Sequence, residues 1–409
     1  MAHHLTRSRS LRAVITFAAG GFGFAAGNIV LAMVMPAADF GIVALALALN
    51  QFSLTIGTFG MEVIVNRHRP KVDGTFTTYL LIAATSTSAI IALGAGYYYK
   101  LPAILMLLLF VMVVASTTNR VIAAVFQEDG RIGGSLLLLQ IHNYTLLIAA
   151  GLVVFMGRWG AAVVVGVVAL GYACTASWGW WHVRRTMSQG RKAVSVRLLL
   201  SEGAAIVGLS VAVQTLFQFE RLAIPKIGSM EMLATYAVLA AVAGSAYRMI
   251  QLGNSFTLLP SLRAARDRGT ARAVIRSESI TAAIAAAGSS VVVIVVAPLV
   301  FHYLLHDKYV IGWELLAVMI AIGLARVWEG FSSTIVSALG TATRMAQLSL
   351  VSWVSLGIAL AGAITGRSFG LLGILCGMQA AWLTLAAAGT WLALRSFKER
   401  FEVAAAVRI

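Results

Sequence analysis

The sequence predicts an all-α, polytopic membrane protein with about twelve transmembrane helices. Hydrophobic residues make up 60% of the 409-residue chain and charged residues 11%, less than half of the share of about 25% charged residues that is usual in soluble domains. Most of the chain lies in apolar runs of about 20 residues, the length that crosses the hydrocarbon core of a bilayer. The connectors between these runs are too short to fold alone, so we expect no separate soluble domain.

Twelve apolar segments, each bounded by polar or charged residues, make up the expected fold. The first follows a basic start and is longer than the apolar part of a cleavable signal peptide, so it counts as a span. In chain order the predicted spans are residues 13–35, 40–65, 78–98, 103–125, 135–156, 161–182, 199–222, 233–259, 279–304, 312–338, 346–365 and 370–394.

The net charge is +16, and the positions of the basic residues indicate how the chain is oriented in the membrane. The basic residues cluster beside span ends instead of forming one basic face with aromatic partners, so we predict no nucleic-acid partner. With a cytoplasmic amino terminus, the inner connectors carry 22 Lys and Arg residues, whereas the outer connectors and outer span ends carry six. By the positive-inside rule, both termini are predicted to be cytoplasmic.

Six spans precede the basic connector around Arg184–Arg197 and six follow it, which predicts two six-helix lobes, residues 1–190 and 191–409. Phe40-Gly41 opens the second span, and Thr235-Tyr236 opens the eighth in a similar layout, 195 positions later. Because each half has an even number of spans, both halves enter the membrane in the same sense. We therefore expect a parallel internal repeat about an axis along the membrane normal.

Sequence motifs of soluble enzymes are absent. There is no GxxxxGK[ST] phosphate loop, no HExxH and no GxSxG elbow, so we expect neither nucleotide-driven transport nor an enzyme. The only cysteines, Cys174 and Cys376, lie inside apolar runs, where they act as small hydrophobic residues. They predict no disulfide framework and no metal site, and no cofactor is expected.

One arginine lies near the middle of the eighth predicted span. Arg248 is the only charged residue between Leu233 and Leu259. A charge at the bilayer centre costs about 2.5 to 3.5 kcal/mol on insertion scales, so it is tolerated mainly where it faces protein or a wet cavity. Gln251 and Asn254 follow about one turn later, on or near the same face. The alternative is an arginine that snorkels or pairs structurally with a neighbouring helix.

Other polar groups near the middle of spans predict a polar interior. Arg326 and Glu329 are three residues apart in the tenth span, so they share a helix face and can pair, either for packing or as a gate or coupling site. Taken singly, amides in spans more often join helices than contact a ligand. The remaining candidates are Arg120, His142, Asn143, Gln214, Gln218, Glu220 and Arg221.

Mid-membrane arginines surrounded by amides suit an anionic, oxygen-rich substrate, because guanidinium groups match phosphate geometry and stay charged when desolvated. The chain resembles the Wzx-like polysaccharide-exporter flippases of the multidrug/oligosaccharidyl-lipid/polysaccharide transporter superfamily. The residues that carry the resemblance are a basic start before a Gly-rich first span, Phe40-Gly41, Gly60-Met61-Glu62 ahead of Arg67, and the progression Glu220-Arg221, Tyr236, Pro260.

The resemblance implies a transporter that moves lipid-linked oligosaccharide, usually linked to undecaprenyl pyrophosphate, from the inner to the outer leaflet of the bacterial inner membrane by alternating access. Such transport serves lipopolysaccharide or exopolysaccharide biosynthesis, with membrane lipids and polysaccharide-assembly proteins as further partners. A cationic cavity would hold the headgroup, and the matching candidates are Arg248, Arg326 and Arg120. Glu329, Glu220 and Arg221 are candidates for ion coupling or a gate.

Three alternatives stay open. A drug or organic-cation antiporter of the same superfamily would favour carboxylates and aromatic rings in its cavity, whereas mid-span arginines outnumber mid-span acids here. A membrane-embedded glycan polymerase or ligase would need a larger outer loop for its acceptor than the short outer connectors provide. A scaffold in a polysaccharide-export complex would need no transport activity at all.

Overall fold

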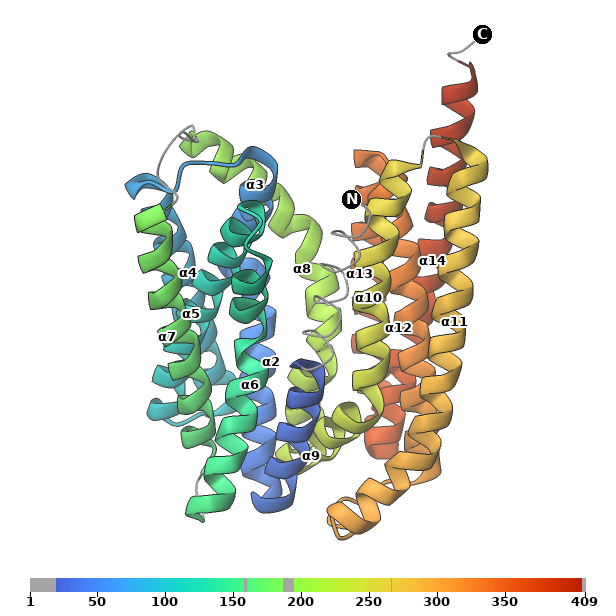
Figure 1. Cartoon of the computed structure of the whole chain (residues 1–409). Coiled ribbons are helices and arrows are strands. Elements are labelled where there is room, and N and C mark those ends of the chain that lie inside the picture. Colours follow the sequence, from blue (N-terminus) through green and yellow to red (C-terminus); the bar gives the residue numbers. More distant parts are fainter. Residues whose placement is uncertain (1–19, 158–159, 187–194, 266, 407–409) are drawn as a thin grey trace. The chain divides into compact units, whose positions relative to one another are not determined.

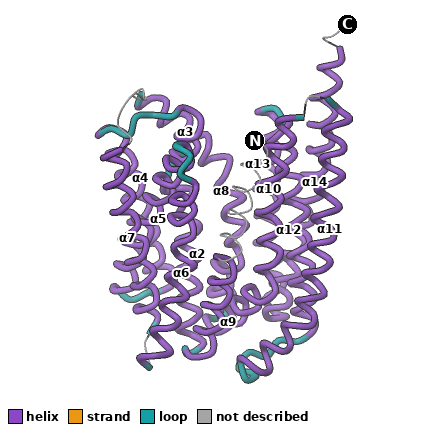
Figure 2. The backbone as a smooth tube through the Cα atoms, in the orientation of Figure 1, coloured by secondary structure: helices purple, strands orange, loops and turns teal. Residues whose placement is uncertain are grey.

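The computed structural model describes residues 20–157, 160–186, 195–265 and 267–406. Within these ranges all regular structure is helical, and short loops join one helix to the next (Figure 2). The start of the first predicted span and the predicted lobe boundary at residues 190 and 191 lie outside the described residues. That division of the chain therefore stays a prediction.

The helices are labelled in Figure 1 in chain order, and an unlabelled helix, Gly20–Val34, precedes them. Their bounds are α2 Ala37–Gly57, α3 Met61–His68, α4 Gly74–Tyr99, α5 Ala103–Glu128, α6 Ile132–Met156, α7 Ala161–Thr186, α8 Val196–Ile227, α9 Met230–Leu239, α10 Ser245–Ala264, α11 Arg268–Leu299, α12 Trp313–Leu339, α13 Ala342–Gly366 and α14 Gly370–Ala406. Two π-helical turns, η1 Ala240–Gly244 and η2 Val300–Leu304, and one 3-10 turn, η3 Arg367–Phe369, complete the series.

Ten helical segments of the described chain are long and apolar enough to cross a membrane. The last of them is a single run that contains both α13 and α14, joined through η3, and Gly20–Val34 is a shorter apolar helix. When α13 and α14 are counted separately and this first helix is added, the described residues hold twelve apolar helical segments. The predicted all-α, polytopic fold class is confirmed, while the orientation of the termini stays a prediction.

The chain forms two compact units. Unit 1 comprises Met1–Gln214 and Ser229–Ala234, and unit 2 comprises Thr215–Gly228 and Thr235–Ile409. The chain therefore passes from unit 1 to unit 2 within α8 and again within α9. Each unit is a bundle that has its own buried core.

In unit 1, α5 packs against α2, α3, α4, α6 and α7. Towards the end of α5, buried apolar side chains from α3 to α8 meet in what we call the unit 1 core cluster. Trp180 and Tyr79 pack against this cluster while remaining partly exposed. The members of the cluster are Met61, Ile64, Val65, Phe76, Leu80, Val121, Ile122, Ala123, Ala124, Val125, Phe126, Leu138, Val183 and Leu199.

A break divides the segment that the sequence predicted as one span over residues 40–65. Helix α2 ends at Gly57, and α3 starts at Met61 after a turn in which Phe59 and Gly60 have positive φ values of 48° and 70°. Glycine adopts this backbone conformation without strain, and a Cβ at Gly60 would also lie 2.9 Å from the side chain of Ile206. The break makes α3 a separate helix whose first turn carries Glu62.

In unit 2, α12 packs against both α10 and α14, while α14 also packs against α13. Helix α10 continues from α9 through η1, so a π-helical turn ends just before the helix that carries Arg248. Pro298 lies inside α11, and η2 begins two residues later. Pro225 and Pro260 lie near the ends of α8 and α10.

The start of α11 is fixed by a local cap. The carboxylate of Asp267 accepts hydrogen bonds from the backbone N of Thr270, at 2.8 Å, and from its hydroxyl, at 2.6 Å. These hydrogen bonds hold the pKa of Asp267 below its ordinary value. An N-cap of this kind satisfies backbone donors that have no partner within the helix. It thereby separates α10 from α11 over a very short connection.

Candidate functional site

Ionisable side chains of three helices gather in the membrane-spanning part of unit 2. We call this set the charged cluster: Glu220 and Arg221 on α8, Arg248 on α10, and Arg326 and Glu329 on α12. Both carboxylates are buried, with 1% exposure for Glu220 and 4% for Glu329, whereas Arg248 is exposed. The packing of α10 against α12 brings residues far apart in the sequence into this one region.

Arg326 is held in place by several partners. Its guanidinium forms an ion pair with Glu220 and lies over the indole ring of Trp382, 4.7 Å from the ring centroid. It also donates a hydrogen bond to the hydroxyl of Tyr236. These contacts offset part of the cost of burying the pair, while Nε of Arg326 and Oε2 of Glu220 have no hydrogen-bond partner among the described residues. Arg326 and Glu220 therefore neutralise each other within the helix packing.

Glu329 has different partners. The amide of Gln251 donates to its Oε2 at 3.2 Å, and the hydroxyl of Ser333 forms a further hydrogen bond. A Cβ at position 330 would collide with Gln251, so Gly330 makes room for this amide. The pairing of Arg326 with Glu329 that the spacing allowed is replaced by the pair with Glu220, which is 106 positions away in the sequence.

Arg248 is the exposed cation of the charged cluster and, like the half-buried Arg221, it forms no ion pair with a carboxylate of the described residues. It lies within electrostatic range of two other arginines, Arg221 and Arg326. Among the described residues it forms no ion pair, and its side chain extends from the exposed face of α10. Because Glu220 is engaged by Arg326, unit 2 presents an accessible excess of positive charge on a membrane helix. An anion that reaches this face would find guanidinium donors that are not engaged by protein acids.

Three further residues that the sequence predicted for the site lie on α8 and α10. Asn254 is buried on α10, and its Nδ2 has no hydrogen-bond partner among the described residues. On α8, Gln218 is buried in the same way, with its Oε1 unpaired, whereas Gln214 is half-buried and belongs to unit 1. The two buried amides retain hydrogen-bonding capacity beside the charged cluster.

The remaining predicted cation, Arg120, belongs to unit 1 and has a carboxylate partner. Its Nε lies 3.3 Å from Oε1 of Glu62, at the start of α3. The sequence did not reveal this pair, because the break between α2 and α3 that turns Glu62 towards α5 was read as continuous helix. Arg120 therefore adds less free charge to unit 1 than Arg248 adds to unit 2.

His142 and Asn143 take part in a polar group on α2, α6 and α7 of unit 1. The Nε2 of His142 lies 3.5 Å from Nε2 of Gln51, and its ring stacks on that of Tyr172 with 6.0 Å between centroids and an interplanar angle of 10°. Asn143 donates a hydrogen bond to the side-chain oxygen of Gln140, one turn earlier. These side chains are engaged with one another.

Sequence reasoning missed the polar contacts that extend this group. Ser116 donates to the side-chain oxygen of Asn50 at 2.6 Å, and Asn50 lies 3.5 Å from the hydroxyl of Tyr172. Asn119 donates to Thr175 at 2.8 Å. The run of small polar residues in the middle of α5 was the available signal. Unit 1 thus offers neutral, largely paired polar groups, whereas unit 2 offers unpaired positive charge.

Metal-binding chemistry finds no support in the described part of the chain. No group of three or more His, Cys, Asp or Glu side chains is placed to hold a metal ion within it. Cys174 and Cys376 are both free and exposed.

The arrangement of helices is shared with known transporters. Neither a family model nor a curated protein sequence matches the chain. A multidrug resistance MATE family transporter of the MOP superfamily, solved in an inward-facing conformation, has a TM-score of 0.63 at 12% identity, over 94% of this chain and 99% of that one. The lipid II flippase MurJ, in an inward closed conformation, has a TM-score of 0.62 at 12% identity, over 95% and 87%.

A Vibrio cholerae MATE transporter in the bent form has a TM-score of 0.51 at 13% identity, over 96% of this chain and all of that one. The chain has the fold of these transporters. At such low identity the similarity extends to the fold, and one fold can serve several functions. The substrate must therefore be argued from the residues of this chain.

Proposed function

We propose that the chain is a flippase that moves a lipid-linked oligosaccharide, with undecaprenyl pyrophosphate as the expected carrier, from the inner to the outer leaflet of a bacterial inner membrane. Its product would feed lipopolysaccharide or exopolysaccharide biosynthesis. This would place the chain with the Wzx-like polysaccharide exporters that its sequence resembles. Polysaccharide-assembly proteins would then be its partners on the outer side.

The observation that carries the proposal is the accessible charge of Arg248. It is exposed on a membrane helix, two further arginines lie within electrostatic range, and no carboxylate in the described part of the chain pairs with it. A diphosphate is an anion with many acceptor oxygens, and guanidinium groups bind such groups in a forked geometry. An organic cation would meet repulsion at the same place. The prenyl tail of the carrier would remain in the lipid.

We further propose separate roles for the two buried acids. Glu220, already paired with Arg326, holds the arginine and α8 in place. Glu329 forms hydrogen bonds with neutral side chains and no ion pair among the described residues. It is therefore the group that can gain or lose a proton during a cycle without first breaking an ion pair. Gln251, which bonds Glu329 and lies one turn after Arg248, would link the proton to the substrate region.

Alternating access is the mode of transport that we propose. The two proteins of similar fold described above were captured in inward-facing and inward closed conformations, so this fold is compatible with more than one state. A flippase needs such states, because the headgroup has to be exposed first to one side of the membrane and then to the other.

The test is reconstitution of the full-length chain into liposomes that contain a fluorescent undecaprenyl-pyrophosphate-linked oligosaccharide. We expect protein-dependent exposure of the glycan to a membrane-impermeant lectin, and a much slower exposure in empty liposomes. Correctly inserted protein that moves no glycan would refute the flippase.

Two further arms address the alternatives. Uptake of an organic cation such as ethidium, driven by a pH gradient, would identify a drug antiporter. Longer glycan chains or new glycosidic bonds on the recovered lipid would identify a polymerase or ligase.

A further inference from the structure

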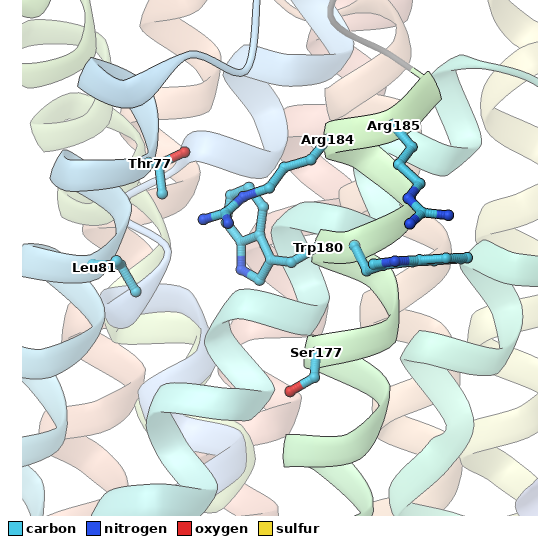
Figure 3. A pocket seen from close by; sticks show the side chains of 7 residues that line it. Thr77, Leu81, Ser177, Trp180, Arg184 and Arg185 are labelled. Carbon is cyan, nitrogen blue, oxygen red and sulfur yellow. The ribbon is translucent and has the colours of Figure 1, made fainter.

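A cavity of about 540 Å³ lies at one end of unit 1, where α4 begins and α7 ends. Thr77 and Leu81 of α4 form one wall (Figure 3). The other wall belongs to α7 and combines two tryptophans with two arginines: Trp180, Trp181, Arg184 and Arg185. This volume is within the range of about 300 to 1,000 Å³ that is typical of small-molecule sites. The described residues that line the cavity include no carboxylate.

The α7 wall is anchored by packing. Trp180 packs against the unit 1 core cluster, to which α7 also contributes the buried Val183. The guanidinium of Arg185 lies over the indole ring of Trp181, 4.2 Å from the ring centroid. Stacking on an aromatic face orients a guanidinium and leaves the N–H donors in the guanidinium plane available to a ligand. Both arginines are exposed, so they can reach a ligand.

The α4 wall indicates what the rest of such a ligand would contact. Leu81 is 43% exposed and the adjacent Ile82 is 56% exposed, so α4 presents apolar side chains to the surroundings beside the cavity. In a membrane-spanning bundle these side chains face lipid tails. Tryptophan and arginine together are typical of the level of the lipid headgroups, because each combines an apolar body with a polar or charged part. A ligand with an anionic group and alkyl chains would match both walls, because the anionic group can bind the arginines of α7 and the alkyl chains can pack along α4.

We propose that this cavity binds the phosphate headgroup of an anionic phospholipid at the membrane surface. The two arginines bind the phosphate, the Thr77 hydroxyl provides a further hydrogen bond, and the acyl chains follow the exposed face of α4. With the orientation predicted from the charge distribution, the site belongs to the cytoplasmic leaflet. The site lies in unit 1, so it is distinct from the charged cluster of unit 2.

Native mass spectrometry of the full-length protein, released from nanodiscs that contain equal amounts of phosphatidylglycerol and phosphatidylcholine, tests this site. We expect phosphatidylglycerol to remain bound preferentially to the wild type. The variant Arg184→Gln/Arg185→Gln should lose about tenfold or more of this binding, because two basic contacts are removed. Arg184→Lys/Arg185→Lys should retain part of it, because charge remains without the forked donors.

Arg272→Gln/Arg276→Gln is the matched control, because it removes two exposed arginines from α11, which line no part of the cavity. It should retain phosphatidylglycerol as the wild type does. Equal retention in Arg184→Gln/Arg185→Gln would overturn the proposal, as would the absence of a preference for phosphatidylglycerol over phosphatidylcholine. Inorganic phosphate that displaces the lipid completely at millimolar concentration would likewise overturn it, in favour of a soluble phosphate ligand.

Discussion

The arginine side chains of the membrane-spanning helices differ in whether a carboxylate pairs with them. Arg120 pairs with Glu62 and Arg326 pairs with Glu220, whereas Arg248 pairs with no carboxylate of the described residues. The guanidinium without a partner is the one that a substrate can engage without first breaking an ion pair inside the protein. Substitutions can test separately whether the guanidinium group of Arg248 and its position on α10 matter.

Replacing Arg248 by lysine should leave membrane insertion unchanged and slow glycan flipping by about tenfold, since a point charge loses the forked donors that grip a diphosphate. Arg248→Ala should be slower still. Flipping rates in liposomes, normalised to inserted protein, measure both variants. Arg263→Lys, an exposed position at the end of the same helix, serves as the control. Wild-type rates in Arg248→Lys would return Arg248 to a structural role.

Glu220 is predicted to matter for stability. Glu220→Gln leaves the guanidinium of Arg326 without its counter-ion in a region with little water, which costs about 3 to 5 kcal/mol when a buried pair is broken. Thermal melting in detergent should show a marked loss for this variant and a partial recovery for Glu220→Gln/Arg326→Met, which removes both charges. Glu314→Gln, at an exposed site, should melt as the wild type does. A double variant no more stable than Glu220→Gln would contradict the pairing.

Two of the predicted spans are interrupted by irregular backbone. The turn at Phe59 and Gly60 separates α2 from α3, and the π-helical turn Ala240–Gly244 precedes α10. Such π-helical turns are often found at functional sites, because the extra residue re-aims the side chains that follow. In the sequence, Gly60 could have indicated the break between α2 and α3. Nothing in an apolar run such as residues 233–259 distinguishes a π turn from an α-helix, because the composition is the same.

The contact between α13 and α14 depends on facing glycines. A Cβ on Gly362 would lie 2.5 Å from the Cα of Gly377, closer than real Cβ contacts. Gly362→Ala should therefore lower stability by about 1 to 3 kcal/mol, the usual cost of overpacking. Gly357 lies on the same helix, with open space at its Cβ position. Gly357→Ala should melt at or above the wild-type temperature, and similar losses in the two variants would disprove the close contact.

At the scale of the whole molecule, the sequence was sufficient for the fold class, because apolar runs of membrane length have few alternatives to helices. Most helix boundaries were predicted to within about five residues. Two were not, because charged residues continue a helix beyond the apolar run: α11 starts at Arg268 instead of residue 279, and α14 extends to Ala406 instead of ending at residue 394. The candidate site was harder to predict. Local spacing favoured Arg326 with Glu329, whereas packing joined Arg326 to Glu220 over a long sequence separation. Pairing between distant helices is decided by how the bundle packs, and one sequence does not contain that information in local form.

The charge distribution predicts the orientation of the whole molecule and, with it, the direction of the proposed flipping. Five arginines lie at or near the connection between α10 and α11, whereas Lys308 is the only Lys or Arg between η2 and α12. The positive-inside rule therefore places Arg263 in the cytoplasm and Lys308 outside. Both side chains are exposed, so each position can carry a single cysteine after Cys174 and Cys376 are replaced by serine. An impermeant maleimide should label Lys308→Cys in intact spheroplasts and Arg263→Cys only after permeabilisation. The reverse pattern would contradict the predicted orientation and would reverse the leaflet from which Arg248 receives substrate in the proposed cycle.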